Sequence, residues 1–402
     1  MNLNYDRSVT FPNGFLANGT SAGIKENGSL DLGLVVSENT ATTAGVFTKN
    51  KFTAAPVILC AKNLLKSKNK CRAIIVNSGC ANALTGKAGL KYAEAIISEI
   101  AKELHVPKAE VLVASTGVIG KQLPVENIIG KVPDLVRGTT IGGDSAFSQS
   151  ILTTDKFPKR VGIEVTVSKD KKFRIGAAAK GAGMIHPNMA TMLCFVTTDA
   201  GVEKKVLQRA LNVSVANSFN TITVDGDTST NDSVFLLANG ASGVKISSAS
   251  EKKIFEEALT AVLVQLAMMI VRDGEGATRF VKLNIESAAT FEDAVKVGRA
   301  VGTSPLVKTA IFGGDPNWGR VLSAVGNSDA RFDPKKVELK IGDVCVFRRN
   351  EPQETDPARL SDLFSKKEIE MTIKLNSGRD SAQVYTCDLS YDYVKINGEY
   401  TT

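Results

Sequence analysis

Short apolar runs alternate with helix-like patterns along the chain, which predicts a mixed fold of the α+β class. The runs are compact, rich in Val, Ile and Ala, and bounded by polar or Gly-containing turns. They predict strands at residues 31–36, 44–48, 72–76, 111–114, 161–167, 173–178 and 281–286. Apolar side chains at helical spacing predict helices at about residues 88–104, 203–219, 251–271 and 291–301.

The helix expected at 251–271 is strongly apolar from Ala258 onward. Its apolar stretch is short for a membrane span and is interrupted by Thr260 and Gln265, so a central buried helix is expected. Residues 393–402 alternate between apolar and polar positions, which indicates an end of the chain that is tied down.

The stretch 180–196 changes character at Thr191. Before it, the composition is small, Gly-rich and Pro-containing, as in a loop. After it, the chain is apolar, as in a buried strand. If the bond before Thr191 were cut, a free α-amine would stand beside the Thr hydroxyl and form a nucleophile with its own base. The other interpretation is a loop entering a strand, with Thr as an ordinary strand residue.

Composition limits the class of partners. The chain has 402 residues, 43% hydrophobic and 23% charged, with a net charge of +7 spread along its length. The densest basic cluster, between Lys62 and Arg72, has almost no aromatic residues, which argues against nucleic-acid binding. The mild positive charge would suit small anionic substrates. The N-terminus lacks a signal pattern, so a cytoplasmic protein without membrane attachment is expected.

Cysteine and histidine usage argues against a metal site. The six cysteines include no Cys-x-x-Cys pair, and the chain has two histidines. This pattern disfavours both a zinc site and a disulfide framework. His105 is expected at a helix end, in a surface or capping role, whereas His186 lies in the central loop, where a functional role stays open.

Three positions combine chemistry with glycine-containing turns. Thr116 and Gly117 follow the strand 111–114 and could offer a hydroxyl and a backbone N–H to an oxyanion, or form an ordinary turn. Lys180 is expected at the end of a strand. Its side chain could face the substrate with its charge, or it could be an ordinary solvent-exposed lysine. Glu275 is flanked by glycines that allow close ligand approach or cap the helix before it. The acidic loop 222–232 lacks the glycine and glutamate positions of a calcium loop.

Several of these motifs, in the same order along the whole chain, resemble the ornithine acetyltransferase family, also called glutamate N-acetyltransferase. The strongest is KGAGMIHPNMATML at residues 180–193. Supporting motifs are found at residues 77–82, 115–120, 153–155, 225–232 and 314–320 and at the terminal Thr401-Thr402. One departure is Lys156, where the family usually has another Thr, and this puts the local substrate-loop geometry in question.

The resemblance implies a precursor that cuts itself between Ala190 and Thr191, giving an α chain of residues 1–190 and a β chain of residues 191–402. Thr191 is then the nucleophile, with an oxyanion site at Thr116 and Gly117. The implied substrate contacts are Thr154, Lys180, Thr191, Glu275, Asn397 and Thr402. The implied fold is a layered α-β-β-α sandwich, in a tetramer of two α and two β chains.

The resemblance also implies the reaction. The acetyl group of N2-acetyl-L-ornithine passes to L-glutamate through an acetyl-Thr191 intermediate, with no metal and no organic cofactor. Use of acetyl-CoA as a second acetyl donor stays open. Two alternatives remain: a self-processing amidohydrolase or aminopeptidase in which water accepts the acyl group, and a non-catalytic binding module with the same fold.

Overall fold

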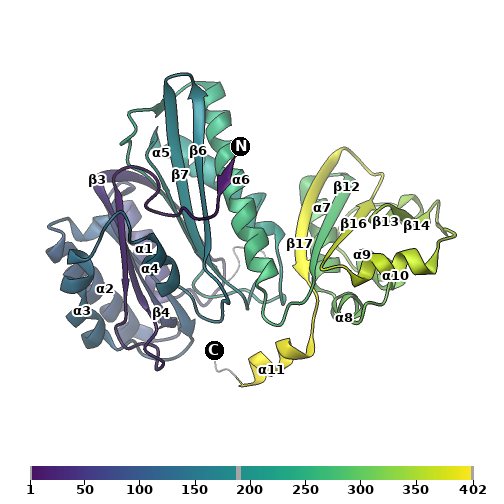
Figure 1. Ribbon diagram of the computed structural model, residues 1–402, viewed down its shortest axis with the longest axis horizontal. Helices are drawn as coiled ribbons and strands as arrows, with labels where there is room; N and C mark the ends of the chain where they lie inside the picture. Colours follow the sequence, from purple (N-terminus) through teal and green to yellow (C-terminus); the bar gives the residue numbers. More distant parts are fainter. Residues whose placement is uncertain (1, 187–191, 400–402) are drawn as a thin grey trace.

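The computed structural model describes residues 2–186 and 192–399 and divides into two lobes (Figure 1). The first lobe is built on a nine-stranded sheet in the order β1-β6-β7-β8-β10-β3-β4-β5, with β2 paired to β3. Its strands are β1 (Leu3–Asn4), β2 (Phe15–Thr20), β3 (Leu32–Phe47), β4 (Lys70–Cys80), β5 (Val111–Val118), β6 (Lys159–Ser168), β7 (Lys171–Lys180), β8 (Leu193–Thr198) and β10 (Ser233–Ala238). A small pair, β9 (Gly201–Val202) and β11 (Lys245–Ile246), lies beside it.

Strand β8 shows why these apolar runs form the centre of the sheet. Every residue of β8 is buried, and it pairs antiparallel with β7 and parallel with β10. Because side chains of a strand alternate between faces, Phe195 joins one core while Cys194 and Val196 join another. A strand covered on both faces reads as a continuous apolar run, as the sequence has it.

Helices cover the two outer faces of this lobe. On one face α5 (Lys204–Ala216) and α6 (Ala249–Arg272) pack over β6 and β7 and the end of β3. On the other, α1 (Ala55–Lys66), α2 (Gly86–Glu103) and α3 (Val125–Arg137) pack together on the β5 side. Between these helix layers, strands from both ends of the sheet order contribute side chains to one core. In this core Phe147 of α4 (Asp144–Ser150) packs edge to face on Phe195, with ring centroids 5.3 Å apart. The expected α-β-β-α layering is confirmed.

Two sequence expectations are corrected by this lobe. The segments 31–36 and 44–48, expected as separate strands, belong to the single strand β3. Its register against β4 shifts between Val36 and Ala41, where three exposed polar residues, 38–40, interrupt the apolar pattern and bend the strand. The apolar pattern is therefore interrupted at residues 38–40, although the strand continues through them.

Helix α6 is confirmed as a central buried helix. By length and composition it would be apolar enough to cross a membrane. Instead, Phe255, Leu259, Leu263 and Leu266 are fully buried in the core against the sheet and α5. A capping box between Ser248 and Glu251 fixes its first turn.

The second lobe has its own six-stranded sheet, in the order β15-β14-β13-β16-β12-β17. Strand β16 alternates buried and exposed positions, the pattern of a sheet with one face on the core. The strands are β12 (Phe280–Ala288), β13 (Glu338–Ile341), β14 (Val344–Arg348), β15 (Glu351–Pro352), β16 (Glu368–Lys374) and β17 (Asp380–Cys387), and the helices are α7 (Phe291–Thr303), α8 (Pro305–Gly313), α9 (Trp318–Gly326) and α10 (Pro357–Ser365). Short 3-10 turns lie at Lys108–Glu110, Phe219–Thr221 and Pro334–Lys336.

The described part of the C-terminal segment is a helix, α11 (Tyr391–Glu399), where the sequence showed an alternating pattern. It lies outside both cores, below the junction of the lobes in Figure 1. Ser390 donates a hydrogen bond to the carbonyl of Gly276, and Asn397 donates one to Glu275. The segment is therefore tied down, as expected, by polar contacts to the turn after α6.

Candidate active site

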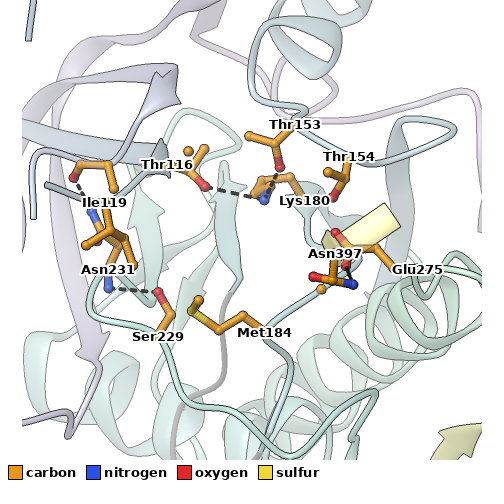
Figure 2. A pocket seen from close by; sticks show the side chains of 13 residues that line it. Thr116, Ile119, Thr153, Thr154, Lys180, Met184, Ser229, Asn231, Glu275 and Asn397 are labelled. Carbon is orange, nitrogen blue, oxygen red and sulfur yellow. Dashed lines mark hydrogen bonds between the residues drawn. The ribbon is translucent and has the colours of Figure 1, made fainter. Parts of the chain in front are cut away.

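A pocket in the first lobe brings together all six of the predicted site residues that the structure describes (Figure 2). They are Thr116, Gly117, Thr154, Lys180, Glu275 and Asn397. They come from the end of β5, the segment before β6, the end of β7, the turn after α6, and α11. The pocket is completed by Ala81, Ile119, Thr153, Gly183, Met184, Ser229 and Asn231. Ala190, Thr191 and Thr402 lie outside the described residues.

Parallel pairing of β4 and β5 places the predicted oxyanion residues. Gly117 pairs with Gly79 and has φ of +125°, a conformation that L side chains rarely adopt. A side-chain carbon at Gly117 would overlap the backbone of Gly79. Glycine is therefore required at residue 117 because two strands approach closely there. Gly117 lies within β5 and not in a turn. Thr116 stands next to it with its hydroxyl in the pocket.

Lys180 is a buried lysine, only 4% exposed, so its interpretation as a solvent lysine is wrong. Its Nζ donates to Thr153 Oγ1 at 2.8 Å and to Thr116 Oγ1 at 3.3 Å. Burial lowers the pKa of Lys180, and Asp155, at 3.8 Å, opposes that shift. Because the Thr116 hydroxyl accepts from Lys180, its own proton is available to an acceptor in the pocket.

Glu275 is the buried carboxylate among the residues that line the pocket. Its Oε2 accepts a hydrogen bond of 2.9 Å from Asn397 Nδ2. Its backbone N–H donates to the carbonyl of Ala182 at 2.9 Å, which joins the turn after α6 to the end of β7. Gly183 lies directly against the Glu275 carboxylate. The pocket lining thus includes both a buried lysine and a buried carboxylate.

The polar loop before β10 supports the site through Asn231, which sequence reasoning did not assign. Its Nδ2 donates to the carbonyls of Ala81 and Ser115, at 2.6 and 2.9 Å. These bonds tie the loop to the ends of β4 and β5. Asn231 belongs to the motif 225–232, but its partners are backbone carbonyls more than a hundred residues away along the chain, so no local pattern indicates them.

Two carboxyls, the half-buried Asp225 and the buried Asp232, accept hydrogen bonds from backbone N–H groups of residues 184, 185 and 192. Asp225 accepts from the N–H groups of Met184 and Ile185, at 2.5 and 2.8 Å. Burial raises the pKa of Asp225 to about 6, although these hydrogen bonds oppose the shift. Asp232 accepts from the N–H of Met192 at 3.1 Å, and burial raises the pKa of Asp232 well above its usual range.

No histidine or cysteine is among the described residues that line this pocket. His186 lies outside the pocket lining and contacts Thr223 Oγ1 at 3.3 Å through Nδ1. His105 follows α2 with φ of +53°. The six cysteines are free thiols. Within residues 2–186 and 192–399, no group of three or more His, Cys, Asp or Glu side chains is arranged to hold a metal ion.

Lys156, the departure from the family pattern, proves to be an exposed side chain. Its contribution is its backbone N–H, which donates to Asp273 Oδ2 at 3.0 Å. Any residue other than proline offers that donor. The loop geometry is therefore compatible with lysine at this position.

The chain matches the profile of the ArgJ family over residues 16–402. It is 46% identical to the arginine biosynthesis bifunctional protein ArgJ of Dehalococcoides mccartyi, covering 99% of this chain and 98% of that protein. It is 44% identical to a glutamate N-acetyltransferase of Methanocaldococcus jannaschii, covering 99% of each. Among solved structures, the ornithine acetyltransferase of Mycobacterium tuberculosis complexed with ornithine is 37% identical, with a TM-score of 0.43, over 46% of this chain and 98% of that one.

Proposed function

This chain belongs to the ArgJ family, and from that premise we propose that it is the acetyltransferase of arginine biosynthesis that uses N2-acetyl-L-ornithine and L-glutamate. The acetyl group moves from ornithine nitrogen to glutamate nitrogen, which yields L-ornithine and N-acetyl-L-glutamate. The enzyme is an acyltransferase, and its substrates are small molecules.

The observation that carries this proposal is the pocket itself. It combines the Thr116-Gly117 pair with a buried ammonium, Lys180, and a buried carboxylate, Glu275. An α-amino acid with a second amine carries one anionic and at least one cationic group. Opposite charges among the residues that line one pocket match that pattern. We assign Lys180 to the substrate carboxylate, and Glu275 with Asn397 and the terminal Thr402 to the amine end, with Thr154 lining the space between.

Thr191 is the proposed nucleophile, and two features support its placement beside this pocket. Leu193, two residues further along the chain, is the antiparallel partner of Lys180. Met192 is held by Asp232 at the start of β8. The backbone that follows Thr191 is therefore fixed next to the pocket lysine.

The reaction needs a base and an oxyanion site. An unperturbed α-amine has a pKa near 7.7–8.0, far below that of a lysine, so a free α-amine at Thr191 would be neutral in about a tenth or more of the molecules near neutral pH. It takes the hydroxyl proton as the oxygen attacks the acetyl carbonyl, and the Thr116 hydroxyl and Gly117 N–H stabilise the oxyanion. The C–N bond breaks, the proton passes to the leaving ornithine amine, and an acetyl ester remains. The glutamate amine then attacks that ester, and the Thr191 hydroxyl is restored.

The proposed maturation uses the same hydroxyl against the Ala190 carbonyl. It gives chains of residues 1–190 and 191–402, which we propose assemble as two α and two β chains in the cytoplasm. The reaction requires no metal and no organic cofactor.

Mass spectrometry tests the nucleophile first. Wild-type protein should contain two fragments that meet between residues 190 and 191. Thr191→Ala should remain a single chain of 42.7 kDa and should transfer no acetyl group. A single uncut wild-type chain would contradict the nucleophile assignment.

Incubation with N2-acetyl-L-ornithine, with and without glutamate, separates the transferase from a hydrolase. We expect ornithine release to require glutamate and to match N-acetylglutamate in amount. Release that ignores glutamate would favour the amidohydrolase alternative. A second assay, with acetyl-CoA and glutamate, decides whether acetyl-CoA also serves as an acetyl donor. The names of the two relatives differ on this point, because one is called bifunctional and the other is named for a single activity.

A further inference from the structure

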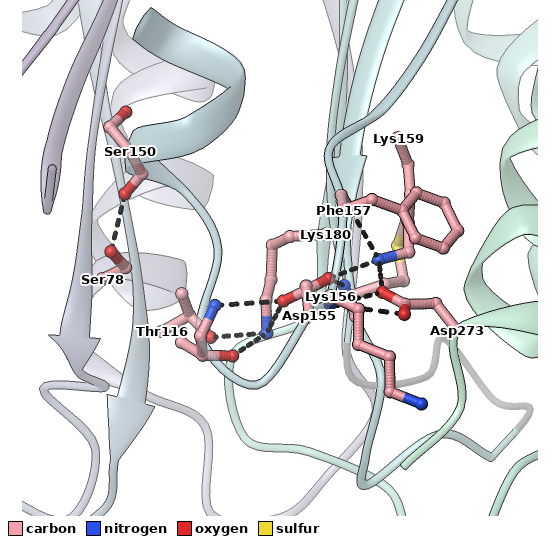
Figure 3. Close-up of polar contacts among 12 residues, drawn as sticks. Ser78, Thr116, Ser150, Asp155, Lys156, Phe157, Lys159, Lys180 and Asp273 are labelled. Carbon is pink, nitrogen blue, oxygen red and sulfur yellow. Dashed lines mark hydrogen bonds and ion pairs between the residues drawn. The ribbon is translucent and has the colours of Figure 1, made fainter. Parts of the chain in front are cut away.

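Lys159, the first residue of β6, is a fully buried lysine that does not line the pocket. Its Nζ lies 2.6 Å from Asp155 Oδ1 and 2.6 Å from Asp273 Oδ2, and the side chains of both carboxylates are completely buried (Figure 3). A buried ammonium needs such partners, because removing an unpaired charge from water costs several kcal/mol or more. Sequence reasoning assigned no role to Lys159 or Asp273.

Asp155 connects Lys159 to Lys180, the buried lysine that lines the pocket. Besides Lys159, it accepts from the N–H of Gly181 at 2.6 Å and of Thr153 at 3.0 Å, and lies 3.8 Å from Lys180 Nζ. Burial alone would raise the pKa of Asp155, but Lys180 and Lys159 outweigh it and hold that pKa below its usual range. Asp155 is thus an anion that holds the end of β7, where Lys180 stands.

Asp273 connects Lys159 to the turn that carries Glu275. It caps the C-terminal end of α6, two residues before Glu275, and accepts from the Lys156 N–H. Burial raises the pKa of Asp273, and Lys159 opposes that shift. Lys159 therefore stands between a carboxylate that holds Lys180 and a carboxylate in the turn that carries Glu275.

The four charges alternate in sign: Lys180, Asp155, Lys159 and Asp273. Replacing Lys159 by an uncharged residue would leave Asp155 and Asp273 buried without the ammonium between them. The end of β7 and the turn after α6 would then lose the contact that connects them. Of these four residues, Lys159 is the one that contacts both Asp155 and Asp273.

We propose that Lys159 is a positioning residue that fixes the spacing between Lys180 and Glu275 through Asp155 and Asp273, and thereby sets the affinity for a diamino acid without touching it. The assignment of substrate charges to Lys180 and Glu275 rests on the proposed function. Because effects through geometry act on substrate placement, KM and the Kd for ornithine should change more than kcat.

The test uses Lys159→Met, which keeps the length of the side chain and removes its charge, and the double variant Lys159→Met/Asp273→Asn, which restores the balance of buried charge. Lys282→Met is the matched control, because Lys282 forms a partly exposed ion pair with Glu370 at 3.1 Å in the second lobe. The readouts are the Tm, the KM and kcat with N2-acetyl-L-ornithine, and the Kd of ornithine by calorimetry.

We expect Lys159→Met to lower the Tm and to raise KM and the ornithine Kd by about tenfold or more, with a smaller change in kcat. The double variant should recover most of the Tm and keep the raised KM and Kd, because charge balance returns while the bridge does not. The control should match the wild type throughout.

Two results would overturn the proposal. One is a double variant in which KM and Kd return to wild-type values together with the Tm, since Lys159 would then act on stability alone. The other is a folded Lys159→Met protein with unchanged KM and Kd. A wild-type enzyme without acetyl transfer would refute the proposed function instead, and the ornithine Kd would still report on Lys159; absence of ornithine binding to the wild type would overturn both.

Discussion

Gly183 lies so close to Glu275 that a methyl group on Gly183 would overlap the Glu275 carboxylate. The contact joins the segment after β7 to the turn after α6 across the pocket. It leaves the carboxylate no room to turn away from the substrate space on that side.

Gly183→Ala should therefore displace the Glu275 side chain and lower kcat/KM for N2-acetyl-L-ornithine by about tenfold or more. Circular dichroism should show an unchanged fold. Gly130→Ala is the control, because Gly130 lies within α3 with open space around it, and there alanine should stabilise by about 0.5–1 kcal/mol without changing activity. Full activity in Gly183→Ala would show that the carboxylate position is not critical.

Asn231→Ala should destabilise the first lobe. It removes both hydrogen bonds to the carbonyls of Ala81 and Ser115, at a cost of about 0.5–1.5 kcal/mol for each hydrogen bond. Urea denaturation measures the change. Asn217→Ala, which removes an exposed hydrogen bond at the C-terminal end of α5, should change the free energy of unfolding by less than about 0.5 kcal/mol. Equal effects of the two substitutions would contradict the structural role of Asn231.

Asp225 gives a pH-dependent contribution with a definite sign. Its folded-state pKa of about 6 is above the value of about 3.9 in an unfolded chain. Below about pH 4 both states are protonated and the contribution is complete; as pH rises to about 6 the unfolded chain ionises first, so stability is lost.

Asp225→Asn cannot titrate and isolates this term. The free energy of unfolding of the wild type, minus that of Asp225→Asn, should fall by about 3 kcal/mol between about pH 4 and pH 6 and stay constant above. Denaturant titrations at a series of pH values measure it. A difference that does not change with pH would mean that the folded-state pKa of Asp225 is close to its unfolded value.

Asp232 should be a neutral carboxylic acid at neutral pH. Burial raises its pKa well above the usual range, and its Oδ2 is buried without a hydrogen-bond partner in the described part of the chain. Infrared spectroscopy should show a protonated-carboxyl band at neutral pH that disappears in Asp232→Asn. Because the amide oxygen can still accept from Met192, that variant should fold. If the band persists in Asp232→Asn, it belongs to another group.

Local patterns predicted the elements whose environment is uniform along their length. The apolar runs of β4, β5 and β7 and the helical spacing in α2 and α6 all appear where the sequence placed them. Strand β3 was expected as two strands, because its exposed polar residues 38–40 interrupt the apolar pattern, and α11 was not recognised as a helix, because it has no buried residue.

Some residues of the site were likewise predicted from the sequence, and others were not. Thr116, Lys180, Glu275 and Asn397 were predicted through motifs that resemble the family, and the pocket confirms that they lie together. Lys159 and Asp273 pair across 114 positions of sequence, and nothing in the residues around either one indicates the other. The roles of all the predicted site residues stay predictions, and Ala190, Thr191 and Thr402 also lie outside the described structure.

Strand β8 begins just after the proposed cut and has β7 on one side and β10 on the other. A cut before β8 would therefore produce two polypeptides that were folded as one. Neither has a complete sheet alone, so dilution should not separate them, and mixing two separately expressed halves should rarely rebuild the enzyme. If the chain is cut there, the association of the two parts is inherited from the intact precursor, and folding has to come before cutting.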